Sequence, residues 1–299
     1  MVKTISPPPI SGTIERLRKS SGLAVQNWAD EIRVRSQDYV DLAKGHHTYT
    51  GADVEKIASN LELGTDSLYS GQIDFRAFAR KYQKNTLPEK YHFGQFSKLR
   101  TVISVLDGFE DYYGWEARLN VMSALGITEA ALSSPESNCS SRLIADVCQE
   151  IDAQARPHHL FFLDLGAYST VTYSDSPLAK VFSRYSTPKE LYERSFYELV
   201  PEYENNHDYR VVEIGHDYCH VELRPKLAVV DAFGTTRFTN GQNCLVKAGV
   251  MSTLVGYLGL PCAHVTETEC VYRGNKRCLF EIDFKMANRL LDENKRAAN

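Results

Sequence analysis

Two cysteines toward the C-terminal end of the chain have the spacing of paired metal ligands. Cys270 and Cys278 are separated by seven residues, which include the turn formers Gly274 and Asn275. Apolar and polar residues alternate on both sides of this turn, which is typical of a β-hairpin. A hairpin would bring the two thiols together, and zinc takes four nitrogen, sulfur or oxygen ligands. The spacing alone leaves two interpretations open: half of a zinc site, or two half-buried small apolar side chains.

The elements around these cysteines have a mixed α/β pattern. The predicted hairpin consists of strands at 265–272 and 278–284. Upstream, apolar runs and alternation predict further strands at 159–165, 169–173, 209–224 and 226–233. Apolar residues at helical spacing predict helices at 177–200 and 247–258. In the second of these helices, Gly249, Ser252 and Gly256 form a row of small residues along which another element could pack closely.

Residues 244–284 resemble the 4-vinyl-reductase domain family, which includes the ligand-sensing domains of aromatic-responsive bacterial activators. The shared features are a helix with small residues, a strand of ETEC type, a turn with glycine, and a cysteine before an alternating strand. They occur here in the segment CLVKAGVMSTLVGYLGLPCAHVTETECVYRGNKRCLFEIDF. The resemblance implies a structural zinc held by three cysteines and one glutamate. The three cysteines correspond to Cys244, Cys270 and Cys278.

The glutamate implied by this resemblance should lie on a strand upstream of Cys244. Glu222 fits this description best, and His220 is the alternative because side chains two residues apart share one face of a strand. Weaker candidates are Cys219, Cys262 and Glu267. Cys139 and Cys148 are expected in helix cores.

The resemblance also implies a cavity, because the family binds small apolar or aromatic molecules between its helices and its sheet. Aromatic side chains that could line it are Phe161, Phe162, Tyr168, Tyr173, Phe182, Tyr185, Phe196 and Tyr197. Each of them is equally explained by core packing. One branch of the family is associated with pigment reduction, so a reductase-like enzyme is an alternative function. We nevertheless expect no enzyme, because the sequence has no Walker loop, no G-x-G-x-x-G motif and no signature of a Cys–His nucleophile.

The N-terminal part of the chain has an all-α pattern. Apolar residues recur at helical spacing in short pieces at 14–17, 28–32, 39–43, 54–61 and 68–69. Residues 14–71 resemble the Xre/Cro-type helix-turn-helix family, in the segments IERLRKSSGLAVQNWADEIRV, RSQDYVDLAKG and DVEKIASNLELGTDSLYSG. In that family the third helix enters the major groove of DNA.

This second resemblance implies a set of DNA-contacting residues. Arg35, Ser36 and Gln37 would begin the recognition helix and face base edges. Gln26 would lie near a phosphate at the start of the preceding helix, and Lys44 at the end of the recognition helix. Arginine and glutamine have the hydrogen-bonding geometry for guanine and adenine edges, so the pattern predicts a DNA-reading face.

The local charge argues against strong DNA binding. Asp38 and Asp41 lie on the predicted recognition helix, and residues 14–74 contain seven basic and ten acidic residues. Phosphate neutralisation supplies most non-specific DNA affinity. The stretch 76–100, with seven basic residues and one acidic residue, could compensate along the DNA backbone. The alternative function is a protein-interaction scaffold whose helix-turn-helix no longer binds DNA.

Composition favours a globular protein with more than one part. Its 299 residues are 43% hydrophobic and 24% charged, with a net charge of -4. The absence of an apolar leader and of a run of eighteen apolar residues predicts a cytoplasmic protein with no membrane segment. Its seven cysteines are then expected to be reduced or metal-bound.

We therefore expect a multidomain chain that regulates transcription. The expected parts are a flexible leader (1–12), an all-α helix-turn-helix module (13–75), a basic and helical connector for dimerisation (76–156), an α/β (α+β) sensor domain with antiparallel sheet, zinc site and C-terminal β-hairpin (157–292), and a polar tail (293–299). The connector is expected to contain a long helix from residue 99 and a later one opened by residues 133–135. The expected partners are DNA, a small hydrophobic or aromatic ligand, and a second copy of the chain, because palindromic operators require two-fold symmetric proteins.

Overall fold

The computed structural model describes residues 10–44, 46, 48–158, 160–200 and 204–297. The chain divides into two compact units, one of residues 1–86 with 127–133 and the other of residues 87–126 with 134–299. This division differs from the expected one, because the region 76–156 is shared between the two units instead of forming a connector. The helices between residues 99 and 155 bury apolar faces within the second unit and are therefore part of that unit's core.

The first unit begins with five helices, as the apolar spacing predicts. They are α1 (Ile10–Ser21), α2 (Val25–Glu31), α3 (Ser36–Ala43), α4 (Gly51–Leu61) and α5 (Thr65–Ser70), and α6 (Phe75–Arg80) follows them. The apolar face of α1, with Ile14 and Leu17, is fully buried together with Trp28 of α2. Because α1 starts at Ile10, the expected leader 1–12 is too long, and its residues 1–9 lie outside the described residues.

The helical layer of the second unit contains a long helix, as expected, and a short two-stranded pair that the sequence did not predict. Its elements are η1 (Glu89–Tyr91), β1 (Ser97–Lys98), α7 (Leu99–Tyr113), α8 (Trp115–Leu125), β2 (Asn138–Cys139) and α9 (Ser141–Ala155). Ser140 caps α9, so this helix starts later than the expected residues 133–135. Cys148 is buried in α9 as expected, whereas the buried Cys139 is on β2 and not in a helix.

Three segments that were predicted as strands are helical. The segments 159–165, 169–173 and 226–233 contain α10 (Phe161–Ala167), α11 (Ser169–Thr172) and α15 (Leu227–Phe233), while His159 lies outside the described residues. Segments as short as these have too few residues for apolar spacing to separate a strand from a helix. The region 177–200, predicted as helical, contains α12 (Pro177–Phe182), α13 (Pro188–Arg194) and the π-helical η2 (Ser195–Leu199). The helix predicted at 247–258 starts six residues earlier, as α16 (Gly241–Thr253), and ends as η3 (Leu254–Leu258).

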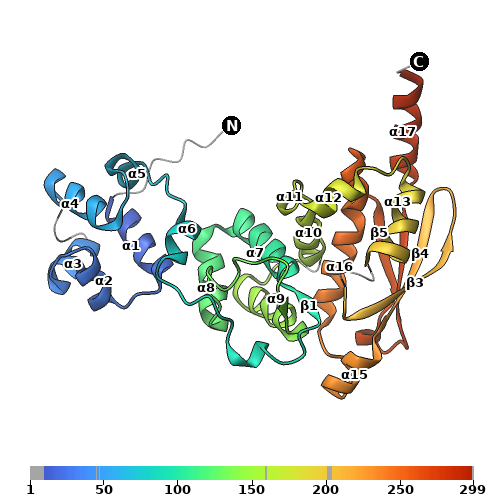
Figure 1. The fold of residues 1–299 in the computed structure, drawn as a ribbon, viewed down its shortest axis with the longest axis horizontal. Coiled ribbons are helices and arrows are strands. Elements are labelled where there is room, and N and C mark those ends of the chain that lie inside the picture. Colours follow the sequence, from blue (N-terminus) through green and yellow to red (C-terminus); the bar gives the residue numbers. More distant parts are fainter. Residues whose placement is uncertain (1–9, 45, 47, 159, 201–203, 298–299) are drawn as a thin grey trace. The chain divides into compact units, whose positions relative to one another are not determined.

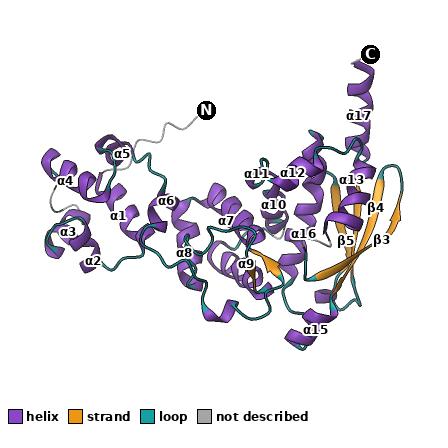
Figure 2. Cartoon of the chain, viewed as in Figure 1, coloured by secondary structure: helices purple, strands orange, loops and turns teal. Residues whose placement is uncertain are grey.

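Beside the short β1–β2 pair, the second unit contains a four-stranded antiparallel sheet, so the expected α+β class with a C-terminal hairpin is confirmed (Figure 2). Its order is β3-β4-β6-β5, from β3 (His207–Ile214), β4 (Tyr218–Pro225), β5 (His264–Glu269) and β6 (Cys278–Asp283). Helices α13 and α16 pack on one face of the sheet, where Val221, Phe280 and Ile282 are buried (Figure 1). The hairpin β5–β6 presents its two cysteines at the turn, next to α16.

Helices α10 and α16 approach each other so closely that both need glycine at the contact. A Cβ atom on Gly249 would lie 2.0 Å from the backbone oxygen of Leu163, and one on Gly166 would lie 2.0 Å from that of Val246. Of the predicted row of small residues, Gly249 therefore lies at a close helix contact. A Cβ on Gly256, which lies on η3, would meet nothing within 4 Å. This contact fixes α16, which carries both Cys244 and part of a cavity wall.

The C-terminal segment is a helix, α17 (Lys285–Ala297), and not the polar tail expected from residue 293 onward. Arg289 and Glu293 form an ion pair at the favourable i,i+4 spacing, which supports the helix in spite of its polarity. Among all the described helices, none combines the length and the apolar character that crossing a bilayer requires.

Candidate metal centre and cavity

Four side chains from α16 and the two arms of the β5–β6 hairpin converge at the hairpin's turn. They are Cys244 in the first turn of α16, Glu267 on β5, Cys270 directly after β5, and Cys278 at the start of β6. One ligand atom from each lies within 4.8 Å of the others. The Sγ atom of Cys244 is 3.9 Å from the Sγ atoms of both Cys270 and Cys278. Tetrahedral zinc with bonds of about 2.3 Å holds sulfurs about 3.8 Å apart, so the geometry fits this metal.

The two oxygens of the Glu267 carboxylate differ, because Oε2 accepts a hydrogen bond from Arg273 at 3.2 Å and Oε1 is buried. The side chain of Glu267 is only 8% exposed, and within the described part of the chain its buried Oε1 atom has no hydrogen-bond partner. Burial, reinforced by Cys270 and Cys278, raises the pKa of Glu267 to about 9. A buried carboxylate oxygen without a donor is costly, and a bound cation would satisfy it.

The thiols also have the electrostatic properties of metal ligands. Contact with the thiol of Cys244 lowers the pKa of Cys270 to about 5 and lowers that of Cys278. The same contacts raise the pKa of Cys244. Thiolates, not thiols, bind zinc, so the cluster favours deprotonation at two of its three sulfurs before a metal adds its own charge.

A β-bulge and a tight turn bring Glu267 and Cys270 to the same side. The register of β5 shifts between Glu267, which pairs with Phe280, and Glu269, which pairs with Leu279. Glu267 therefore lies on the buried face, and Glu269 on the opposite one. After the bulge, the side chain of Asn275 accepts a hydrogen bond from the backbone nitrogen of Cys270 at 3.1 Å, which closes the turn.

The expected fourth ligand, Glu222, lies outside the cluster. Glu222 pairs with Leu279 across the sheet, whereas its neighbour Leu223 pairs with Cys278, so the Glu222 side chain points to the opposite face. There its carboxylate binds Arg224, and at 3.2 Å also Arg277. The glutamate in the cluster is Glu267, because its position on β5 faces the cysteines, whereas Glu222 occupies the opposite face of the sheet.

The other proposed ligands are also outside the cluster. His220 shares the face of Glu222, and its ring is 3.8 Å from the carboxylate of Glu213. Cys219 is buried in the sheet core, and Cys262 is exposed. The sequence contained a signal for Glu267, since it belongs to the ETEC segment itself. Strict alternation, however, places Glu267 and Cys270 on opposite faces, and only the bulge removes this conflict.

The residues expected to contact DNA lie together on α2 and α3, and several of them bind each other or nearby aspartates. Arg35, at the start of α3, is 86% exposed and binds Asp38 through two hydrogen bonds of 2.7 and 2.9 Å. Ser36 donates to Gln26 at 2.6 Å, and Gln37 donates to Asp41 at 3.1 Å. Lys44 follows the last turn of α3. The two aspartates thus bind two of the side chains that were expected to read bases.

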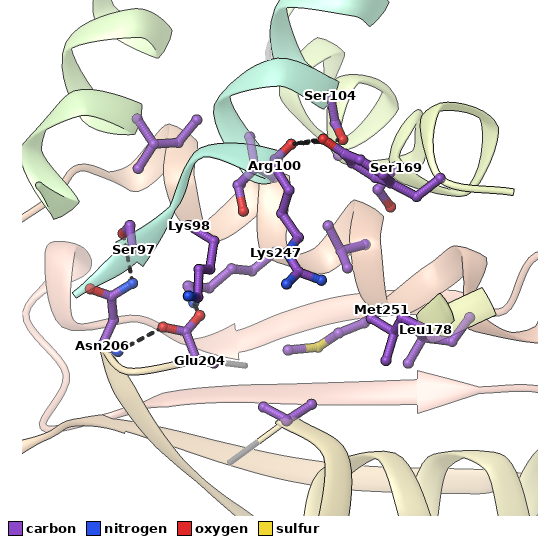
Figure 3. A pocket seen from close by; sticks show the side chains of 18 of the residues that line it. Ser97, Lys98, Arg100, Ser104, Ser169, Leu178, Glu204, Asn206, Lys247 and Met251 are labelled. Carbon is purple, nitrogen blue, oxygen red and sulfur yellow. Dashed lines mark hydrogen bonds and ion pairs between the residues drawn. The ribbon is translucent and has the colours of Figure 1, made fainter. Parts of the chain in front are cut away.

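A cavity of about 200 Å³ lies inside the second unit (Figure 3). Of the eight aromatic residues expected around a ligand, Tyr173, Phe182 and Phe196 line it. The other five, which are Phe161, Phe162, Tyr168, Tyr185 and Tyr197, are not among its lining residues. Helix α16 contributes Val246, Lys247, Val250 and Met251 to the wall. The same helix therefore provides a cavity wall and, through Cys244, a member of the metal cluster.

Comparison with known proteins identifies no family. No family model matches the chain, and no curated protein matches its sequence. Solved structures with some similarity include an Fe(II) unliganded H-NOX protein variant from K. algicida, at 15% identity and a TM-score of 0.46 over 62% of this chain and 95% of that one. An oxygen-binding H-NOX domain related to soluble guanylate cyclases has 14% identity and a TM-score of 0.43, over 63% of this chain and 95% of that one. We take neither fold nor function from similarities of this size.

Proposed function

We propose that this chain is a one-component transcriptional regulator whose second unit senses a small apolar or aromatic ligand and contains a structural zinc. The observation that carries the proposal is the convergence of Cys244, Glu267, Cys270 and Cys278, where one buried carboxylate oxygen has no donor among the described residues. Three thiolates and one carboxylate are a zinc ligand set. When bound, zinc would supply a cross-link between α16 and the β5–β6 hairpin.

The position of α16 connects this cross-link to the ligand. Cys244 lies in its first turn, and Lys247, Val250 and Met251 line the cavity further along. Glycines at the α10 contact fix the helix on one side, and the metal cluster fixes it at its start. A ligand that binds one arrangement of α16 more tightly would shift the population toward that arrangement. This is how we propose that the cavity controls the protein, which would act as a homodimer on palindromic DNA.

The zinc part of the proposal is tested by paired cysteine substitutions. In Cys278→Ser, a cluster ligand is weakened, whereas in Cys262→Ser an exposed cysteine outside the cluster changes in the same way. Elemental analysis of full-length protein purified without added metal should find about one zinc per chain in the wild type and in Cys262→Ser. It should find almost none in Cys278→Ser. Equal zinc in both variants would contradict the proposed ligand set.

A protein-interaction scaffold is the second candidate, and a specific observation favours it. Arg35 and Gln37 are held by Asp38 and Asp41, so the face expected to read DNA is largely satisfied by its own helix. Binding of the full chain to random duplex at two salt concentrations separates the candidates. A DNA reader loses affinity steeply as salt rises, whereas a scaffold shows no binding at either concentration.

The residues responsible for DNA binding are tested by a matched pair of lysines. Lys44 follows the proposed recognition helix, and Lys56 is an exposed lysine on α4. Lys44→Gln should weaken binding to duplex and reduce its salt dependence, while Lys56→Gln should leave both unchanged. Equal effects of the two substitutions would favour a non-specific charge effect over the proposed docking of α3.

A further inference from the structure

The charges around the cavity of the second unit are unbalanced. The described residues that line it include three cations, Lys98, Arg100 and Lys247, but a single carboxylate, that of Glu204. The rest of the wall is mainly apolar, with Val105, Leu178, Phe182, Phe196, Val250, Met251 and Leu254. An anionic ligand would gain favourable electrostatic contacts with this lining, which an uncharged apolar ligand would not.

One of the three cations is already neutralised inside the wall. The Nζ atom of Lys247 lies 2.6 Å from Glu204 Oε2 and 3.1 Å from the hydroxyl oxygen of Tyr209. Burial works to raise the pKa of Glu204, but the charge of Lys247 outweighs it and lowers this pKa to about 2. Lys247 and Glu204 therefore remain an ion pair, which leaves Lys98 and Arg100 as the other cations that face a ligand, and Arg100 is itself paired with Glu136 outside the lining.

Arg100 has the position and the chemistry to bind an anion. It lies in the first turn of α7, its side chain is 17% exposed, and Figure 3 shows it directed into the cavity. It forms an ion pair with Glu136, a carboxylate that does not line the cavity and is 66% exposed. A guanidinium has five N–H donors and can bind two carboxylates at once. Because Glu136 is close to water, its pairing with Arg100 is weak enough for a ligand to compete.

Lys98 stands beside this pair. Its Nζ atom donates to the backbone oxygen of Glu136 at 2.8 Å, which places the ammonium near the guanidinium's partner. Figure 3 shows Lys98 on the same side of the cavity as Arg100 and Glu204. The cavity thus has a cationic end formed by Lys98 and Arg100, and an apolar end formed by side chains such as Phe182, Phe196 and Met251.

We propose that the cavity takes a small apolar monocarboxylate, with the carboxylate bound by Arg100 and Lys98 and the apolar body against Phe182, Phe196 and Met251. This inference rests on the proposed function, since it names the class of ligand for the sensor cavity. A negative charge is then what distinguishes the molecules that the cavity binds tightly from neutral molecules of the same size. Against the apolar side chains, a strongly hydrated anion such as phosphate would lose water without gaining the contacts that an apolar body makes there.

Calorimetric titration of the full-length protein tests the inference with matched probes. The probes are benzoate, phenylacetate and hexanoate, each compared with its own primary amide, which keeps the shape and removes the charge. We expect the acids to bind about ten to a hundred times more tightly than the amides, which is the usual value of a hydrogen-bonded charge. Amides that bind as tightly as the acids would overturn the inference, while leaving a sensor of neutral apolar ligands in place.

Two substitutions assign the effect to the cationic end. Arg100→Gln should remove most of the preference for acids and leave the affinity for amides unchanged. Arg194→Gln is the matched control, because Arg194 is also paired with a glutamate, Glu198, but does not line the cavity. Zinc content and melting temperature, measured on the same samples, show whether each variant is folded. Equal weakening of acids and amides by Arg100→Gln would overturn the proposed role of Arg100.

A third substitution predicts a gain. Glu136→Gln removes the carboxylate that competes for Arg100, so acids should bind about two to five times more tightly. An unchanged or lower affinity for acids would contradict the competition. If no acid and no amide binds the wild type, the inference fails. Zinc content and DNA binding then decide separately whether the remainder of the proposed function stands.

Discussion

The metal cluster and the α2–α3 face differ in how their polar groups are satisfied, and only the buried groups indicate a specific ligand. The cluster brings together Cys244, Glu267 and the two hairpin cysteines, and no residue in the described part of the chain donates to Oε1 of Glu267. On the α2–α3 face, Arg35 and Gln37 are exposed and bind aspartates three and four residues away on the same helix.

The difference lies in what each arrangement costs. Exposed side chains can pair with their neighbours or with water at almost no cost, so their positions carry little information about a partner. Buried thiols and a buried carboxylate are expensive unless something satisfies them. The cluster therefore supports a specific ligand, a metal ion, while the α2–α3 face is compatible with both DNA and protein partners.

Removal of the metal should have the largest effect. The cluster joins α16 to the hairpin, so a chelator, or the substitution Cys278→Ser, should reduce the free energy of unfolding by at least about 3 kcal/mol. Denaturant unfolding with and without chelator measures this change. Cys262→Ser should respond to the chelator like the wild type. A chelator that leaves the stability of the wild type unchanged would remove the structural role of the metal.

Loss of the buried ion pair between Lys247 and Glu204 should have the next largest effect on the free energy of unfolding. The contribution of this pair depends on pH. The pKa of Glu204 is lowered from 4.5 to about 2 in the folded chain, so its stabilising contribution is present above pH 4.5 and is lost as the pH falls toward 2. Its size is about 3 kcal/mol at neutral pH, from the difference in pKa.

Substitution of this carboxylate checks the assignment. Glu204→Gln leaves Lys247 buried without its charge partner, so the variant should be less stable at neutral pH and should lack this component of acid sensitivity. Lys81 and Glu62 form an exposed ion pair, so Glu62→Gln is the matched control, with an expected cost below about 1 kcal/mol. Equal acid profiles for wild type and Glu204→Gln would contradict the assignment.

The two glutamates near the hairpin should differ in their effect on zinc affinity. Glu267→Gln removes a ligand charge and should lower zinc affinity about tenfold or more. Glu222→Gln, on the opposite face of the sheet, should leave zinc affinity unchanged and affect only the pairing with Arg224 and Arg277. Competition with a coloured chelator measures both affinities. A larger effect from Glu222→Gln would restore the ligand set expected from the sequence.

A substitution on the exposed α2–α3 face should have the smallest effect, which is a change in affinity for duplex DNA. Asp38→Asn frees Arg35 and removes a negative charge from the proposed DNA surface, so duplex binding should strengthen about threefold at low salt. Asp66→Asn on α5 changes net charge equally and is the control. Equal gains from both substitutions would mean that only net charge matters.

The sequence predicted most of the helices and the hairpin, because amphipathic periodicity and turn residues are local signals. Five N-terminal helices and the paired strands around Cys270 and Cys278 lie where the patterns indicated. The segment at 159–165 was assigned the wrong structure because its apolar run is buried on several sides, against α7 and α16, and such burial removes the periodicity.

The metal site was predictable only in part. Three cysteines were found through a family resemblance, but the fourth ligand depended on which face of a strand each glutamate occupies. A single bulge between Glu267 and Glu269 decides this, and no residue pattern around it announces the extra residue. The cavity's charge was equally hidden, since Arg100 and Lys247 are distant in sequence and meet only through packing.

The zinc absorption edge of full-length protein, purified without added metal, tests the central claim most directly. We expect about one zinc per chain, with three sulfur ligands at about 2.3 Å and one oxygen ligand at about 2.0 Å. Protein without zinc, or zinc in a shell that lacks three sulfurs, would contradict the site formed by Cys244, Glu267, Cys270 and Cys278.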